Sequence, residues 1–243
     1  MKQKDIRSIA RYFALVCAGT VLAGCGGPAY VKMTPETGAE LKAAPVINVV
    51  WFRTVGMNIM TPKSQAGGGL LPALIVSGTK SGELPSGDQL VKAYGLPDQA
   101  DEVSAKLVEK LKTEGRLPTV RVASALFPPR VYQENPAQYG SKFSSGLVLE
   151  INVEGPGAGY GAMNWQTYTY GFAGKARLIR PSDGKILWSD LCFLGIFGDE
   201  ADKRKLDVTE FEKDGGKRFK EIYHYSNDRC SRILADKLLG KAS

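Results

Sequence analysis

The pattern of apolar and polar positions after residue 45 alternates between strands and helices. Residues 46–52 form a near-continuous apolar run, which is typical of a strand buried on both faces of a sheet. Asp98 precedes an apolar stripe at helical spacing that stops before Gly115, so the pattern predicts an amphipathic helix capped by Asp98. Residues 119–123 are expected to form a further short strand.

The second half of the chain is predicted to contribute three strands and a closing helix. Residues 147–153 alternate with a period of two, and the segments 167–180 and 185–188 flank a Pro-Ser-Asp-Gly turn, which favours a hairpin. Residues 211–239 carry apolar side chains at helical spacing, and Gly215 and Gly216 indicate that the regular part begins after them. The expected fold class is α/β, an α+β sandwich with two main helices on a mixed sheet.

The first residues carry a different pattern. A basic start leads into an apolar run over residues 12–23, and Leu22, Ala23 and Gly24 stand directly before Cys25. Small residues before a cysteine indicate a lipobox, so residues 1–24 are predicted to be a signal peptide and Cys25 to carry a diacylglycerol. The alternative is an uncleaved anchor, but the 13 residues from Tyr12 to Gly24 fall short of the roughly 20 that span a bilayer.

The segment after the lipobox predicts where the domain begins. Residues 25–45 hold several prolines and glycines and show no helical or strand period, so we expect a flexible tether behind the lipidated cysteine. Residues 46–243 are then a single domain facing the periplasm. Gly26, in place of an aspartate that would resemble an inner-membrane retention signal, favours the outer membrane.

Charge and cysteine usage both change once the leader is removed. The formal net charge is +7 for the whole chain, and the chain after residue 24 has 28 basic and 24 acidic residues. This scattered excess argues against nucleic acid as a partner, while weak attraction to anionic headgroups or peptidoglycan stays open. Cys17 leaves with the leader, so Cys192 and Cys230 are predicted to form a disulfide. The alternative is two free thiols packed separately.

Candidate catalytic chemistry is sparse. Hydrolytic triads and most metal sites use histidine, and the chain has one, His224. Glu221 and Asp228 stand at helical spacing from it, which makes the trio the best candidate for an acid-base or metal site. The alternative is a solvated helix face. We therefore expect no enzyme, no metal and no cofactor except the covalent lipid on Cys25.

Two other segments are candidates for partner binding. The glycine-rich residues 155–161 are expected to be a flexible hairpin loop, because a phosphate cradle would need a helix to follow at once. An apolar island over residues 70–76 either docks a partner or packs into the core. Aromatic side chains near the glycines either stack on a partner or pack across strands. The candidate partner-binding residues are Tyr160, Trp165, Tyr168, Tyr170, Leu70, Leu71 and Leu74.

The lipobox, the opening apolar strand, the helix, the hairpin and the closing helix together resemble periplasmic lipoproteins with a TolB N-terminal or CsgG-like α/β domain. The residue pattern that carries this resemblance is the run Ser182, Asp183, Gly184, Lys185, Ile186, Leu187, Trp188. The resemblance implies a non-enzymatic accessory factor that binds an envelope protein in cell-envelope assembly or secretion, with its oligomeric state undetermined. The alternatives are a CsgG-like secretion pore component or an envelope hydrolase.

Overall fold

The computed structural model describes residues 30–54, 56–60, 85–123, 136–161, 164–198 and 200–241. The fold belongs to the unit that begins at Val31. The predicted apolar island over residues 70–76 and the predicted lipidation site Cys25 lie outside the described residues.

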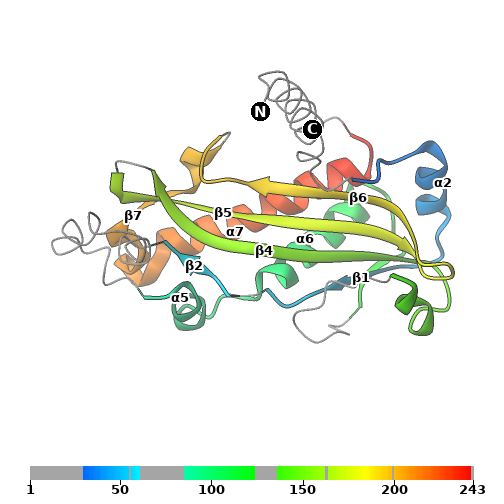
Figure 1. Cartoon of the computed structure of the whole chain (residues 1–243), viewed down its shortest axis with the longest axis horizontal. Helices are drawn as coiled ribbons and strands as arrows, with labels where there is room; N and C mark the ends of the chain where they lie inside the picture. The colour runs from blue at the N-terminus through cyan, green and yellow to red at the C-terminus, as the bar shows by residue number, and fades with distance from the viewer. Residues whose placement is uncertain are drawn as a thin grey trace, which may run out of the picture. The chain divides into compact units, whose positions relative to one another are not determined.

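A mixed sheet forms the centre of this unit. In the described ranges its strands follow the order β3-β1-β4-β5-β6, with β2 beside β4 and β7 beside β5 (Figure 1). β1 lies between β3 and β4 and is parallel to both, whereas β4, β5 and β6 run antiparallel. The mixed α/β sheet predicted from the sequence is therefore confirmed. The strands are β1 Ile47–Trp51, β2 Asn58–Ile59, β3 Val120–Val122, β4 Leu147–Gly161, β5 Asn164–Arg180, β6 Lys185–Leu194 and β7 Lys205–Asp207.

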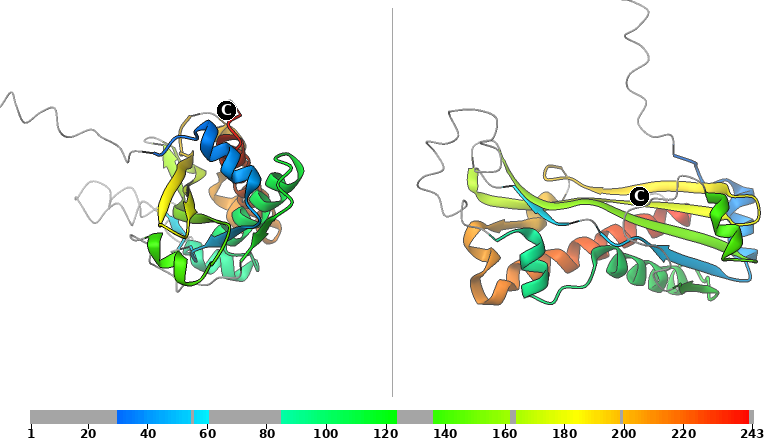
Figure 2. Two further views of the ribbon diagram at one scale, coloured as in Figure 1. Left: turned by 90° about the vertical axis from the view of Figure 1, so that its right-hand side faces the viewer. Right: turned by 60° about the horizontal axis from the view of Figure 1, so that its bottom comes forward.

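Two long helices cover one face of the sheet (Figures 1 and 2). α6 (Gln99–Thr113) begins where the sequence predicts, because the Asp98 side chain accepts a hydrogen bond from the Ala100 amide. α7 (Lys213–Leu238) has left-handed backbone at residues 214–216, so its regular part begins after the two glycines, as predicted. The shorter helices are α2 (Pro35–Ala43), α5 (Gly87–Ala93) and the 3-10 turns η3 (Pro136–Ser141), η4 (Ala201–Arg204) and η5 (Val208–Phe211).

The main core lies between this sheet face and the two helices. The predicted disulfide is present: it joins Cys192 of β6 to Cys230 of α7 with a Cα–Cα distance of 5.4 Å, and both residues are buried. Lys237 of α7 also donates to a carboxylate oxygen of Asp190 on β6 at 2.7 Å. The closing helix is thus attached to the last long strand at two places. Core residues that are less than 2% exposed include Ile47, Val49, Leu107, Leu111, Leu149, Leu178 and Phe219.

The opposite sheet face carries a buried ion pair under η3. The guanidinium of Arg177 donates to Glu150 at 2.5 Å, and the Tyr139 hydroxyl donates to the other carboxylate oxygen at 2.5 Å. Burial raises the pKa of Glu150, while Arg177 and Tyr139 act in the opposite direction. Val148 and Ile179 pack beside this group in a second, smaller apolar cluster.

The segment predicted to be a flexible tether is structured from Val31 onward. Val31 pairs with β6, because its amide donates to Ser189 Oγ and its carbonyl accepts from the Ser189 amide, both at 2.9 Å. α2 follows, with Thr34 as its N-cap and Leu41 buried at 3% exposure. The prediction of a tether reaching residue 45 is therefore wrong over 31–45. The cause is that α2 buries only Thr37 and Leu41, which are too few positions to give a visible period.

The glycine-rich residues 155–161 are also corrected by the structure. They continue strand β4 and do not form a hairpin loop. A Cβ at Gly157 would lie 2.2 Å from the carbonyl oxygen of Asn58 on β2, so glycine there allows two backbones to approach closely. Glycine at position 157 thus reflects the close packing of β4 against β2.

Candidate functional site

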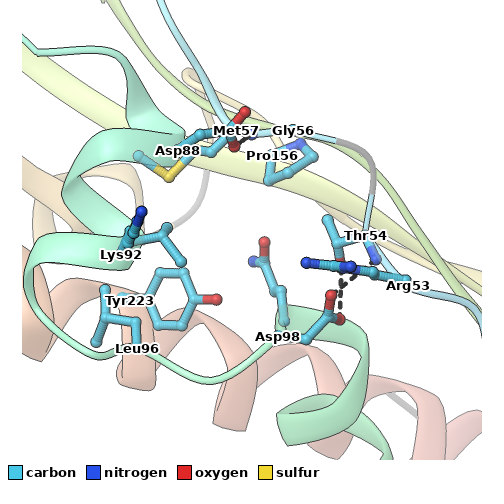
Figure 3. Close-up of a pocket in the computed structure, with 12 residues that line it drawn as sticks. Arg53, Thr54, Gly56, Met57, Asp88, Lys92, Leu96, Asp98, Pro156 and Tyr223 are labelled. Atoms are coloured by element: carbon cyan, nitrogen blue, oxygen red, sulfur yellow. Dashed lines mark hydrogen bonds between the residues drawn. The ribbon is translucent and has the colours of Figure 1, made fainter. Parts of the chain in front are cut away.

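A cavity opens at the carboxyl end of β1. It has a volume of about 630 Å³ and lies between the chain that follows β1, the helix α5 and the first turn of α6 (Figure 3). β1 has parallel neighbours on both sides, and its connections lead first to one neighbour and later to the other. In open sheets, ligands commonly bind outside the carboxyl end of a strand at such a switch in strand order.

Two carboxylates of the cavity hold its walls together. Asp98 accepts from the backbone amide and the hydroxyl of Thr54, both at 3.0 Å, and from the Ala100 amide at 2.9 Å (Figure 3). Asp88 accepts from the Met57 amide at 2.7 Å. Each acid therefore fixes the segment after β1 to the start of a helix. Asp98 accepts on both of its oxygens and Asp88 accepts on Oδ1, so both carboxylates serve to hold this wall together.

The remaining polar groups at the mouth are cationic. Arg53 and Lys92 line opposite sides of the cavity and are exposed (Figure 3). Neither side chain forms an ion pair with any residue that the structure describes. Met57, Val91, Leu96 and Pro156 supply apolar wall. The cavity thus combines an apolar lining with two unengaged positive charges.

Tyr223 reaches the cavity from α7 but offers no nucleophile. Its hydroxyl donates to the Pro97 carbonyl at 2.7 Å, and burial raises its pKa, with the nearby Glu102 and Asp98 acting in the same direction. The phenol stays protonated at neutral pH. Its role in the cavity wall is to hold the turn between α5 and α6 against α7.

The predicted trio around His224 is not assembled. His224 Nδ1 lies 2.8 Å from a carboxylate oxygen of Glu102, which belongs to α6 and not to the predicted set. Glu221 pairs with Arg218 at 3.6 Å, and Asp228 pairs with Lys110 at 3.1 Å. Among the described residues, no group of three or more candidate ligands could hold a metal ion. His224 is therefore part of the contact between the two long helices.

The aromatic residues predicted for partner binding are mostly core. Tyr168 and Tyr170 are fully buried, and Tyr160 is 9% exposed. Tyr168 packs edge to face on Tyr160 and on Phe211, with ring centroids 5.5 and 5.3 Å apart. Burial of Tyr168 and Tyr170 favours the alternative of packing across strands for these two, whereas Tyr160 also lines a second cavity beside Phe197 and stays a candidate. The side chain of Trp165, and the residues Leu70, Leu71 and Leu74, lie outside the description.

Exposed apolar side chains gather elsewhere, at the β6 side of the sheet. Phe193 on β6 is 70% exposed, and Phe197 in the following loop is 72% exposed. The exposure of Phe193 has a signal in the sequence: it directly follows the buried Cys192, and neighbouring side chains of a strand point to opposite faces. The roles of Arg53, Lys92 and Asp88 had no comparable signal, since they meet only through the fold.

No described helix combines the length and the apolar character needed to cross a bilayer. This finding covers the described ranges alone.

No family model matches the chain, and no curated protein matches it. Solved structures similar to it include protein XCC0632 from Xanthomonas campestris, at 12% identity and a TM-score of 0.46 over 86% of this chain and 91% of that one. The PelC dodecamer from Paraburkholderia phytofirmans matches at 10% identity and a TM-score of 0.35, over 88% and 97%. Lipoprotein GNA1162 from Neisseria meningitidis matches at 16% identity and a TM-score of 0.26, over 75% and 97%. Likenesses at these TM-scores carry no argument about activity, and the resemblance to TolB or CsgG-like domains stays a prediction.

Proposed function

We propose that this chain is an outer-membrane lipoprotein, held by a diacylglycerol on Cys25, whose periplasmic domain binds another envelope protein and catalyses no reaction. The observation that supports binding over catalysis is the cavity at the carboxyl end of β1. Its two carboxylates accept bonds from backbone amides, and its tyrosine is protonated and engaged. What the cavity offers to a partner is apolar surface and two free cations.

These groups define the chemistry of the partner segment. Met57 and Leu96 provide contact for one apolar side chain, and Arg53 and Lys92 stand ready for a carboxylate. A charge-assisted bond from a guanidinium to a carboxylate is stronger and more directional than a neutral hydrogen bond. The partner segment is therefore expected to present an apolar residue next to an acidic one.

Crosslinking in intact envelopes tests this proposal. A photoreactive amino acid replaces Lys92 at the mouth of the cavity, and a matched control replaces Lys112, which is exposed on α6 and does not line the cavity. We expect one dominant crosslinked protein from position 92 that is missing from position 112. Adding Arg53→Glu to the first variant should remove that product, because it places a negative charge where the partner's carboxylate binds.

Two results would contradict this function. If positions 92 and 112 give the same products, the cavity is not the binding site. If the only product from position 92 is a second copy of this chain, the protein assembles with itself and not with a different partner. The anchor is tested separately by the mass of the chain isolated from membranes, which should carry a diacylglycerol on Cys25 and lack residues 1–24.

A further inference from the structure

The N-terminal segment is fastened to the outer edge of β6. Val31 forms two hydrogen bonds with Ser189, and Thr37 of α2 donates to the Leu187 carbonyl. The guanidinium of Arg180 binds both carboxylate oxygens of Glu40, at 2.7 and 2.5 Å. Residues 31–43, called the strap below, are thus fixed on the sheet beside β6 (Figure 1).

The strap limits how far the edge of the sheet can lie from the proposed lipid. Five residues separate Cys25 from Val31. Six steps of fully extended chain span about 20 Å at most. Val31, at the edge of β6, is therefore held within about 20 Å of a lipid on Cys25, a distance smaller than the size of the domain.

Exposed apolar side chains are concentrated at this same edge. Four large apolar residues are exposed among those described, and three of them, Val31, Phe193 and Phe197, lie in the strap, on β6 or in the loop after it. Phe193 follows Ser189 by four residues on one strand, which is about 13 Å. Large apolar side chains that are exposed to water on one part of a surface commonly mark an interaction site.

Part of the β6 edge is closed to pairing with another strand. The Ser189 amide already donates to Val31. The Leu191 amide donates to the carboxylate of Asp190 at 2.8 Å, and the Leu191 carbonyl accepts from Lys237 Nζ at 2.9 Å. At residues 189 and 191 the outward-facing backbone groups that an added strand would need are therefore already bonded.

We propose that the β6 edge, made of Val31, residues 189–194 and Phe197, lies against the lipid leaflet that holds the Cys25 anchor, with the rings of Phe193 and Phe197 inserted at its surface. The inference rests on the proposed anchor, and it adds an orientation to it. A single acyl-type attachment lets a domain tumble, whereas a second apolar contact near the first selects one face. With the β6 edge at the leaflet, the cavity at the carboxyl end of β1 stays open to partners.

Tryptophan reporters on the chain as isolated from cells test this orientation. Phe193→Trp and Phe197→Trp are compared with Lys112→Trp, which is exposed on α6, and the emission of the parent chain is subtracted from each. The vesicles consist of phosphatidylethanolamine and phosphatidylglycerol with brominated acyl chains, which quench tryptophan on contact. We expect loss of emission at positions 193 and 197 and none at position 112.

The outcomes separate the anchor from the orientation. Equal quenching at all three positions, or quenching at position 112 alone, overturns the proposed orientation even when the mass shows a lipid on Cys25. Quenching confined to positions 193 and 197 supports it, and a mass without lipid then overturns only the anchor. An emission shift at 193 and 197 that depends on protein concentration and not on vesicles assigns the surface to a second copy and overturns the lipid contact.

Discussion

Gly174 offers a sharp test of how the closing helix is attached to the sheet. Gly174 pairs with Cys192 across β5 and β6, directly beneath the disulfide. A Cβ at this position would lie 2.6 Å from Cys230 Sγ and 2.8 Å from Cys192 Sγ. Neither sulfur can turn away while it is bonded to the other. Gly174→Ala therefore forces the helix and the strand apart.

The expected magnitude follows from two opposing terms. Overpacking of this kind costs about 1–3 kcal/mol. Alanine in a strand interior gains roughly 0.5–1 kcal/mol over glycine, and Gly174 has no positive φ that would exclude it. We expect Gly174→Ala to lower the free energy of unfolding by about 1 kcal/mol, the difference between the midpoints of these two ranges.

The second half of the test removes the sulfurs. Cys192→Ala with Cys230→Ala should itself cost about 4 kcal/mol, because the bridge joins residues 38 apart. In that background nothing remains for the new methyl group to meet, so Gly174→Ala should become neutral or stabilising. Urea unfolding followed by tryptophan fluorescence measures all four proteins. If Gly174→Ala costs the same in both backgrounds, contact with the sulfurs is not the reason for glycine, and the reasoning is refuted.

Two further predictions concern the cavity and the strap. Asp98→Ala removes the acceptor of the Thr54 and Ala100 amides, so we expect a loss of about 1–2 kcal/mol in urea unfolding, with a smaller loss for Asp98→Asn; equal losses would contradict a role for the charge. Glu40→Gln breaks the ion pair with Arg180, which lowers the pKa of Glu40. A carboxyl group with a lowered pKa stabilises the fold at pH values above its unfolded pKa, and this stabilisation is lost as the pH falls through its folded pKa. Glu40→Gln should therefore cost under about 1 kcal/mol of unfolding free energy at neutral pH and nothing in acid. A cost that persists in acid would disprove the ion-pair account.

The parts of the fold that the sequence predicted are those with local signals. Asp98 and the stripe after it defined α6, and the Pro-Ser-Asp-Gly turn defined the hairpin of β5 and β6. The disulfide was predicted because two cysteines remain once Cys17 and Cys25 are assigned, and because the expected compartment is oxidising. Each of these signals lies within a few neighbouring residues or in the number of cysteines, so it can be identified without knowing which distant residues are in contact.

The missed parts depend on contacts between distant residues. The prediction of a tether fails over α2 because its proline and its glycine resemble a linker, while its stability comes from Leu41 and from bonds to β6. α5 carried a local signal, Ser86 and Gln89 in a capping box, that stood inside an otherwise irregular stretch. Glu102, and not Glu221, faces His224 because α6 and α7 lie side by side. A helix-face pattern cannot tell a neighbour on the same helix from one on another.

The bond between Val31 and Ser189 spans 158 residues of sequence. Loop-closure entropy opposes such contacts until the intervening chain has folded, so this one forms among the last. A polypeptide that stops before β6 is complete lacks the groups of Ser189 and Leu187 to which the strap bonds. The N-terminal strap can therefore take its place only on a domain whose last long strand has already folded.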